Sequence, residues 1–142
     1  MRILRLAALG LIVALAMPAH AEDGSDDDDF QTPEAAIVLA LQAAVRADDK
    51  DWFVSHMHFP VRYFGKTKHI ICSKEWFLDH YSTIIGPELK ANILAQDPEK
   101  HFKNYQGLMV GDGGRNIWFE EFGDPGADIP SNYEIITINN SD

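Results

Sequence analysis

Residues 104–122 read NYQGLMVGDGGRNIWFEEF, and they establish the class of fold. Apolar and polar side chains alternate on both sides of the Gly-rich turn Gly111–Gly114, with the period of two that is typical of strands. Glycine supplies the positive φ that tight hairpin turns need. A phosphate-binding loop would be followed by a helix and a Lys, whereas a strand is predicted to follow here. The stretch therefore predicts a β-hairpin.

Further strands are predicted on either side of this hairpin. Tyr133–Asn139, YEIITIN, is expected to form a last strand after the loop GDPGADIPSN. Earlier in the chain, Val61–Phe64 and Thr67–Cys72 are short apolar-rich runs separated by a Gly-Lys pair, which predicts a second hairpin. Cys72 is expected to be a buried small apolar residue, with an intermolecular disulfide as the alternative.

Helical spacing dominates the remaining segments. Thr32–Glu34 begins the first helix with a capping hydroxyl, a Pro at the first helical position and an acid in the first turn. An apolar stripe continues through AAIVLALQAAVRA to a break near Asp48. Asp49 is expected to cap a short second helix, Ser73 a third, and Pro87 to start a fourth.

The order of these elements favours an α+β fold over a doubly wound α/β sheet, because strands have close antiparallel neighbours and helices are grouped. We expect a curved antiparallel sheet wrapped around the long N-terminal helix. A chain of 142 residues with 46% hydrophobic residues suits one core, and residues 30–142 are predicted to form it as a single domain.

The N-terminal segment has the three parts of a secretory signal peptide, which we assign to residues 1–21. Arg2 and Arg5 precede the apolar run LAALGLIVALAM, and Ala19–Ala21 is a small-residue cleavage site. The run is shorter than the roughly 20 residues of a membrane span. We therefore expect a periplasmic or secreted protein that has no membrane attachment after signal removal. The acidic stretch EDGSDDDD, residues 22–29, is expected to be a disordered leader.

The charge balance narrows the classes of partner. Lys and Arg number 12 against 22 for Asp and Glu, giving a formal net charge of −10. Such acidity argues against nucleic acid as the partner, and a single Cys excludes an internal disulfide scaffold. An acidic exported protein suits a basic protein partner, because opposite charges steer the encounter.

The chain resembles the nuclear transport factor 2-like superfamily, whose cone-shaped α+β fold is also called cystatin-like. The resemblance covers residues 30–140, and small exported bacterial proteins of unassigned role show a similar Phe59-Pro60-Val61 turn and a similar final hairpin. It implies the fold and no single activity, because this fold hosts enzymes, ligand binders, immunity proteins and partner-binding modules. The matching stretches are the acidic break Ala47–Trp52, FPVRYFGKTKHI (59–70), SKEWFLDHYSTII (73–85) and QGLMVGDGGRNIWFEEF (106–122).

Candidate catalytic and metal-binding groups are few and scattered. His56 and His58 could both face a metal ion only on extended backbone, and no third ligand is near them in sequence, so no metal site is predicted. His80 shares a helix face with Trp76 and is a candidate general base. Glu121 is another, if its side of the strand faces the concave side of the sheet and burial raises its pKa. We expect no cofactor.

Aromatic residues are more numerous than a core of this size needs, so some are expected to line a ligand pocket or an interaction face. Those with a polar tip and an apolar body are the candidates: Tyr63, Trp76, Tyr105 and Trp118. The sequence thus favours an exported, non-enzymatic binding protein. It would bind a partner protein or a small apolar ligand through the open sheet face or the cone. The alternatives are a small hydrolase or isomerase with a His or Glu base, and a structural homodimer.

Overall fold

The computed structural model describes residues 32–123 and 132–142. The signal peptide predicted for residues 1–21, the leader predicted for residues 22–29 and most of the loop predicted for residues 123–132 lie outside the described residues.

Helices and strands follow the predicted order, so the α+β class and both hairpins are confirmed. The three-residue strand β3 was not predicted, because so short a segment cannot show a period of two. The helices are α1 (Pro33–Ala47), α2 (Lys50–Ser55), α3 (Lys74–Ile84) and α4 (Pro87–Ala95). The strands are β1 (Met57–Phe64), β2 (Lys68–Ile71), β3 (Phe102–Asn104), β4 (Gly107–Asp112), β5 (Arg115–Phe122) and β6 (Asn132–Asn140).

The strands form one six-stranded sheet in the order β2-β1-β6-β5-β4-β3. β1 pairs with β6 in parallel, and the other pairs are antiparallel, so the sheet is mixed. The expectation of an antiparallel sheet is therefore wrong at one pair. Short connections fix the pairing of strands adjacent in sequence, whereas β1 and β6 are joined through most of the chain and can pair in either direction. Register shifts between Met57 and Arg62 and between Trp118 and Phe119 mark bulges, which bend a strand.

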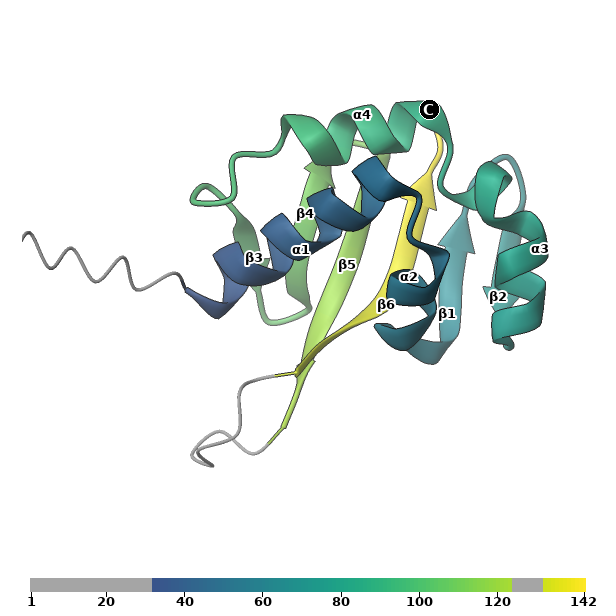
Figure 1. Ribbon diagram of the computed structural model, residues 1–142, viewed down its shortest axis with the longest axis horizontal. Coiled ribbons are helices and arrows are strands. Elements are labelled where there is room, and N and C mark those ends of the chain that lie inside the picture. Colours follow the sequence, from purple (N-terminus) through teal and green to yellow (C-terminus); the bar gives the residue numbers. More distant parts are fainter. Residues whose placement is uncertain (1–31, 124–131) are drawn as a thin grey trace, which may run out of the picture.

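The helices pack on one face of the sheet. Figure 1 shows α1, α2 and α4 in front of the strands, with α3 beside β2 on the same side. The core between the layers is fully or almost fully buried, and includes Leu41 and Val45 from α1, Ile93 from α4, and Ile117 and Ile135 from the sheet. Each such side chain contributes about 1.5–3 kcal/mol when it is removed from water.

The predicted helix starts are confirmed by side-chain caps. The backbone N–H of Ala35 donates to Thr32 Oγ1 at 3.1 Å, and that of Trp52 donates to Asp49 Oδ1 at 3.0 Å. Ser73 Oγ accepts from the N–H of Trp76 at 3.3 Å. Each cap satisfies a donor that the first helical turn leaves without a partner.

Cys72 corrects one expectation, because its side chain is exposed. β2 ends one residue earlier, at Ile71, which is fully buried and fills the core position expected for the cysteine. Cys72 lies just past the strand, where its Sγ donates to the carbonyl oxygen of Ile70 at 3.7 Å.

Candidate functional site

The face of the sheet opposite the helices is not covered by any helix of the described residues, and we call it the open face. Strand register brings one outward side chain from each of the six strands into a line across this face. Cross-strand partners share a face of the sheet, so these side chains are neighbours. We call this line the transverse row; from one edge to the other it consists of Ile70, Arg62, Thr137, Trp118, Met109 and Phe102.

The transverse row is rich in large, partly exposed apolar side chains. Ile70 is 52% exposed and Phe102 is 51% exposed, and Trp118 and Met109 are half-buried. The rings of Phe102 and Trp118 meet edge to face, with centroids 6.2 Å apart. Trp, Phe, Met and Arg are the residue types enriched at the centres of protein interfaces.

A shallow hollow of about 240 Å³ lies in the middle of the open face, beside Trp118. Arg62 borders the hollow, and its guanidinium Nε donates to Thr137 Oγ1 on the neighbouring strand at 3.1 Å, which orients the guanidinium. The hollow is lined by Arg62, Phe64, Gln106, Trp118, Ile136, Thr137 and Asn139. An aromatic wall and an oriented guanidinium therefore meet at one point of the face.

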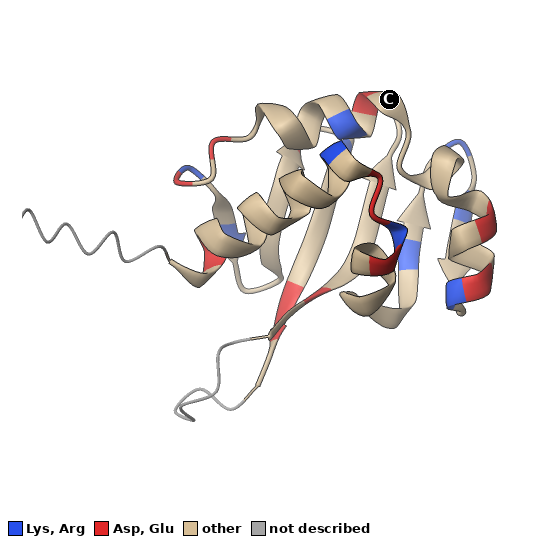
Figure 2. Cartoon of the chain, viewed as in Figure 1, with Lys and Arg blue, Asp and Glu red and all other residues tan. Residues whose placement is uncertain are grey.

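The charge of the open face differs from the acidity of the whole chain. Arg62 and Lys68 supply the basic segments that Figure 2 shows on β1 and β2, and Lys68 Nζ lies 5.9 Å from the ring centroid of Phe64. The acidic segments of β5 and β6 lie instead towards the far ends of these strands (Figure 2). There Glu134 Oε2 lies 2.5 Å from His58 Nδ1, whose ring stacks on Phe122 at 4.1 Å. The centre of the face is thus apolar and cationic.

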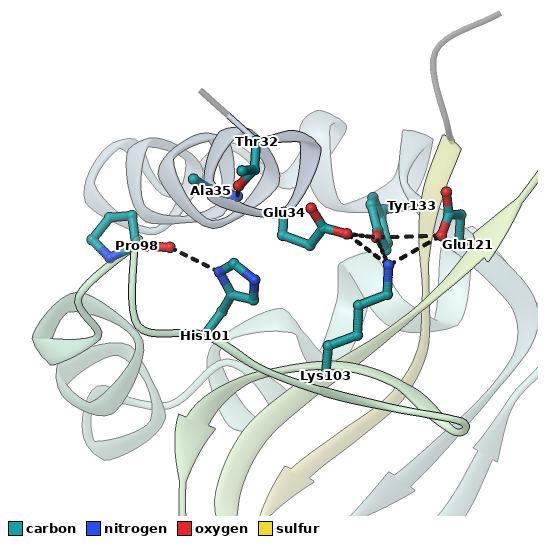
Figure 3. Close-up of polar contacts among 8 residues, drawn as sticks. All are labelled: Thr32, Glu34, Ala35, Pro98, His101, Lys103, Glu121 and Tyr133. Carbon is teal, nitrogen blue, oxygen red and sulfur yellow. Dashed lines mark hydrogen bonds and ion pairs between the residues drawn. The ribbon is translucent and has the colours of Figure 1, made fainter. Parts of the chain in front are cut away.

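A second polar cluster lies on the opposite, helix-bearing face, where α1 begins (Figure 3). Lys103 Nζ on β3 donates to Glu34 Oε1 at 2.6 Å, to the Tyr133 hydroxyl at 2.7 Å and to Glu121 Oε2 at 3.2 Å. The Tyr133 hydroxyl donates to Glu34 Oε1 at 2.6 Å. We call Glu34, Lys103, Glu121 and Tyr133 the lysine cluster; it ties α1 to the sheet.

The electrostatics of the lysine cluster fix its protonation states. Burial alone would raise the pKa of Glu34, but the hydrogen bonds from Lys103 and Tyr133 outweigh it and lower that pKa to about 2. The carboxylate of Glu34 in turn raises the pKa of Lys103. Burial and the bond to Glu34 raise the pKa of Tyr133 to about 12. At neutral pH Glu34 is therefore a carboxylate, Lys103 an ammonium and Tyr133 a phenol, and their hydrogen bonds stabilise these charge states.

The predicted lining residues lie in four different places. Trp118 is on the open face, and Tyr63, which is 7% exposed, lies on the helix-bearing side. Trp76 on α3 is stacked against His69 and His80, with ring centroids 4.0 and 3.9 Å away. Tyr105 is 95% exposed, in the turn between β3 and β4. The four therefore do not form one site.

The candidate catalytic residues are also apart. Glu121 belongs to the lysine cluster, and its side chain is 42% exposed. His80 is exposed on α3, where its Nδ1 lies 2.7 Å from the carbonyl of Trp76. Neither adjoins the hollow of the open face.

The two candidate metal ligands point to different partners. The ring of His56 stacks on Trp52 at 4.0 Å, and its Nδ1 lies 2.8 Å from the carbonyl of Trp52. His58 is on the open face beside Glu134. Within residues 32–123 and 132–142, no group of three or more His, Cys, Asp or Glu side chains is placed to hold a metal ion.

Sequence reasoning missed Arg62, Met109 and Phe102. Alternation along β1 does carry a signal, because Arg62 lies between the inward-facing Val61 and Tyr63. No local sequence pattern predicts the strand register that places Arg62 and Trp118 on either side of Thr137 in β6.

Comparison of the chain with family models, with curated proteins and with solved structures found no match. In the part of the chain that the structure describes, no helix has the length and apolar character needed to cross a membrane.

Proposed function

We propose that the chain is an exported, non-enzymatic binding protein that docks a partner protein on the open face of its sheet. The single observation that carries this proposal is the transverse row, in which partly exposed Trp118, Met109 and Phe102 lie side by side and no helix of residues 32–123 or 132–142 covers them. The finer fold that we propose is the nuclear transport factor 2-like cone, which the long α1, the mixed sheet and the bulges in it support. Export is proposed on the signal-peptide pattern of residues 1–21.

A protein fits the open face better than a small apolar ligand does. Small-molecule sites are usually concave and enclose about 300–1,000 Å³. The hollow beside Trp118 measures about 240 Å³ and is wide open to solvent, so it suits a single protruding side chain of a partner. The row around it supplies the flatter apolar area that surrounds such an anchor in protein interfaces.

The chemistry of the partner follows from the charges on the face. Arg62 and Lys68 lie among the apolar residues, so the partner surface is apolar and carries a carboxylate that pairs with Arg62. The basic partner favoured by the net charge of −10 would instead have to meet carboxylates outside the centre of this face. Both versions lose affinity in high salt, because charge pairs at an interface are screened.

The enzymatic alternative has no comparable support. Glu121 is engaged by Lys103 at 3.2 Å, and His80 lies on another element with its Nδ1 bonded to a backbone carbonyl. A general base and a substrate pocket must lie within hydrogen-bond reach of each other. A homodimer would also use an uncovered sheet face. Native mass spectrometry distinguishes it from a complex with a partner protein by mass.

Trp118→Ala is expected to weaken partner binding at least tenfold and thereby to lower the partner-bound fraction, because a Trp hot spot at the centre of an interface contributes about 2 kcal/mol or more. The measurement is native mass spectrometry of the protein purified from the periplasm of its host at low salt. Leu94→Ala is the matched control, since Leu94 is 37% exposed on α4, away from the open face. Equal bound fractions in the wild type and Trp118→Ala, or a bare homodimer, would contradict the proposal.

A further inference from the structure

We infer a second binding site, for a small anion that carries a carboxylate or phosphate group, in a pocket at the edge of the helix-bearing layer. This end pocket has a volume of about 510 Å³, within the range of small-molecule sites. It lies where the β1–β2 turn, the α3–α4 junction, the start of β5 and the end of β6 come together. Its principal polar residues are Tyr63, Lys66, Ser82, Glu88, Arg115 and Asp142.

Tyr63 presents an unused hydrogen-bonding group to the end pocket. The residue is 7% exposed, yet no hydrogen bond reaches its hydroxyl from any other described residue. Burial raises the pKa of Tyr63, so the hydroxyl keeps its proton and is available as a donor. A Cβ on Gly65 would lie 2.2 Å from the Tyr63 hydroxyl oxygen, so the glycine leaves the room that this hydroxyl occupies. The ring of Tyr63 is buried but its hydroxyl is accessible from the end pocket, so a ligand bound there can accept its hydrogen bond.

Arg115 is the second underused donor of the end pocket. Its Nε is buried and has no partner among the described residues. Its Nη2 donates to Glu88 Oε2 at 3.1 Å and to a carboxylate oxygen of Asp142. The side chains of Glu88 and Asp142 are 74% and 98% exposed, and ion pairs with such exposed groups are worth little in water. The guanidinium is thus held by partners that a ligand can replace.

The N-terminus of α4, the positive end of its helix dipole, borders the same pocket. Gly86 is the N-cap and makes no side-chain cap hydrogen bond, and Pro87 follows at the first helical position. Both residues line the end pocket. An uncapped helix start leaves backbone N–H groups without partners and favours a negative charge beside it. This field reinforces the two donors, Tyr63 and Arg115.

Tyr63, Arg115 and the N-terminus of α4 together favour a small polar anion as the ligand. The carboxylate of Asp142 on Arg115 marks the position that the ligand's own carboxylate or phosphate group would take. Binding therefore requires Asp142 to leave, which costs little because its side chain is almost fully exposed. Tyr63 then donates to the ligand, and Lys66, which is exposed at the rim, adds a second positive charge. A neutral molecule would gain none of these charge-assisted bonds.

The test is a titration of the purified protein at low salt with succinate, inorganic phosphate and glycerol, followed by NMR of the Arg115 Nε–H and Tyr63 signals. Succinate or phosphate is expected to give saturable shifts of both signals, and glycerol none. Asp142→Ala is expected to bind the same anion more tightly by no more than about fivefold, because the competing side-chain carboxylate is gone but its ion pair was weak. Tyr63→Phe is expected to bind about tenfold more weakly, because one hydrogen bond is lost.

Arg115→Gln should abolish the shift of the Tyr63 signal, and Arg46→Gln, an exposed position on α1, is the matched control. Far-UV circular dichroism verifies that each variant is folded. If Arg115→Gln does not fold, the weaker binding expected for Tyr63→Phe still tests the inference. The inference is overturned if neither anion gives a saturable shift in the wild type or Asp142→Ala, or if glycerol shifts the signals equally. No partner protein enters this titration, so its outcome is independent of the function proposed for the open face.

Discussion

Phe53→Ala is expected to lower the free energy of unfolding by about 3–5 kcal/mol. Phe53 is fully buried where α2 meets α3, and its ring lies 6.1 Å from that of Phe77 and 5.7 Å from that of Tyr81. Truncation removes these aromatic contacts and leaves a cavity that the surrounding helices cannot fill without moving. Because small domains have a net stability of about 5–15 kcal/mol, this loss is a large part of the total.

Urea unfolding followed by circular dichroism measures this effect. Phe102→Ala is the control, because Phe102 is 51% exposed and its truncation should cost well under the value for Phe53. Similar losses for both variants would show that the ring cluster of α2 and α3 is not the centre of the core.

Glu34→Gln is expected to lower the free energy of unfolding by about 3 kcal/mol at neutral pH, from the difference between a folded pKa of about 2 and the usual value of 4.5. The substitution replaces the carboxylate that accepts from both Lys103 and Tyr133. It leaves a lysine whose side chain is 39% exposed and a buried phenol with weaker partners. α1 then loses its polar tie to β3 and β6.

The same prediction has a defined dependence on pH. The pKa of Glu34 is depressed in the folded state, so its contribution is fully present above pH 4.5 and is lost as the pH falls towards about 2. Urea unfolding of the wild type and Glu34→Gln at several pH values should therefore show a difference that narrows over this range. A difference that stays constant from pH 7 to pH 2 would contradict the role of the carboxylate. Glu99→Gln, on the exposed loop before β3, is the control.

Local signals in the sequence predicted the local parts of the fold. The hairpin of β4 and β5 was identified from alternation and a glycine turn, and Gly111 and Gly113 adopt positive φ values of 104° and 53°. The caps at Thr32, Asp49 and Ser73 were identified because a cap bonds within three residues of itself. No local signal predicts the parallel pairing of β1 with β6, because this pairing depends on the packing of the intervening helices and strands.

For the candidate sites too, the sequence predicts local properties and not long-range arrangement. Trp118 was identified as a lining residue from its chemistry alone, and it borders the hollow of the open face. Tyr63 was identified on the same grounds but borders the end pocket, because it faces the helices while its neighbour Arg62 faces outward. Residue type thus indicates a role in binding. The surface that a residue joins is decided by strand register across distant segments.

Photo-cross-linking at the open face shows whether a partner protein docks there. p-Benzoylphenylalanine is placed at Met109, in the transverse row, and separately at Leu94 on α4, and the host cells are irradiated. Adducts with one protein of defined mass are expected from position 109 and not from position 94. The Arg62→Gln substitution should diminish these adducts. No adduct from position 109, equal adducts from both positions, or an adduct with twice the mass of the chain would contradict docking of a partner protein on the open face.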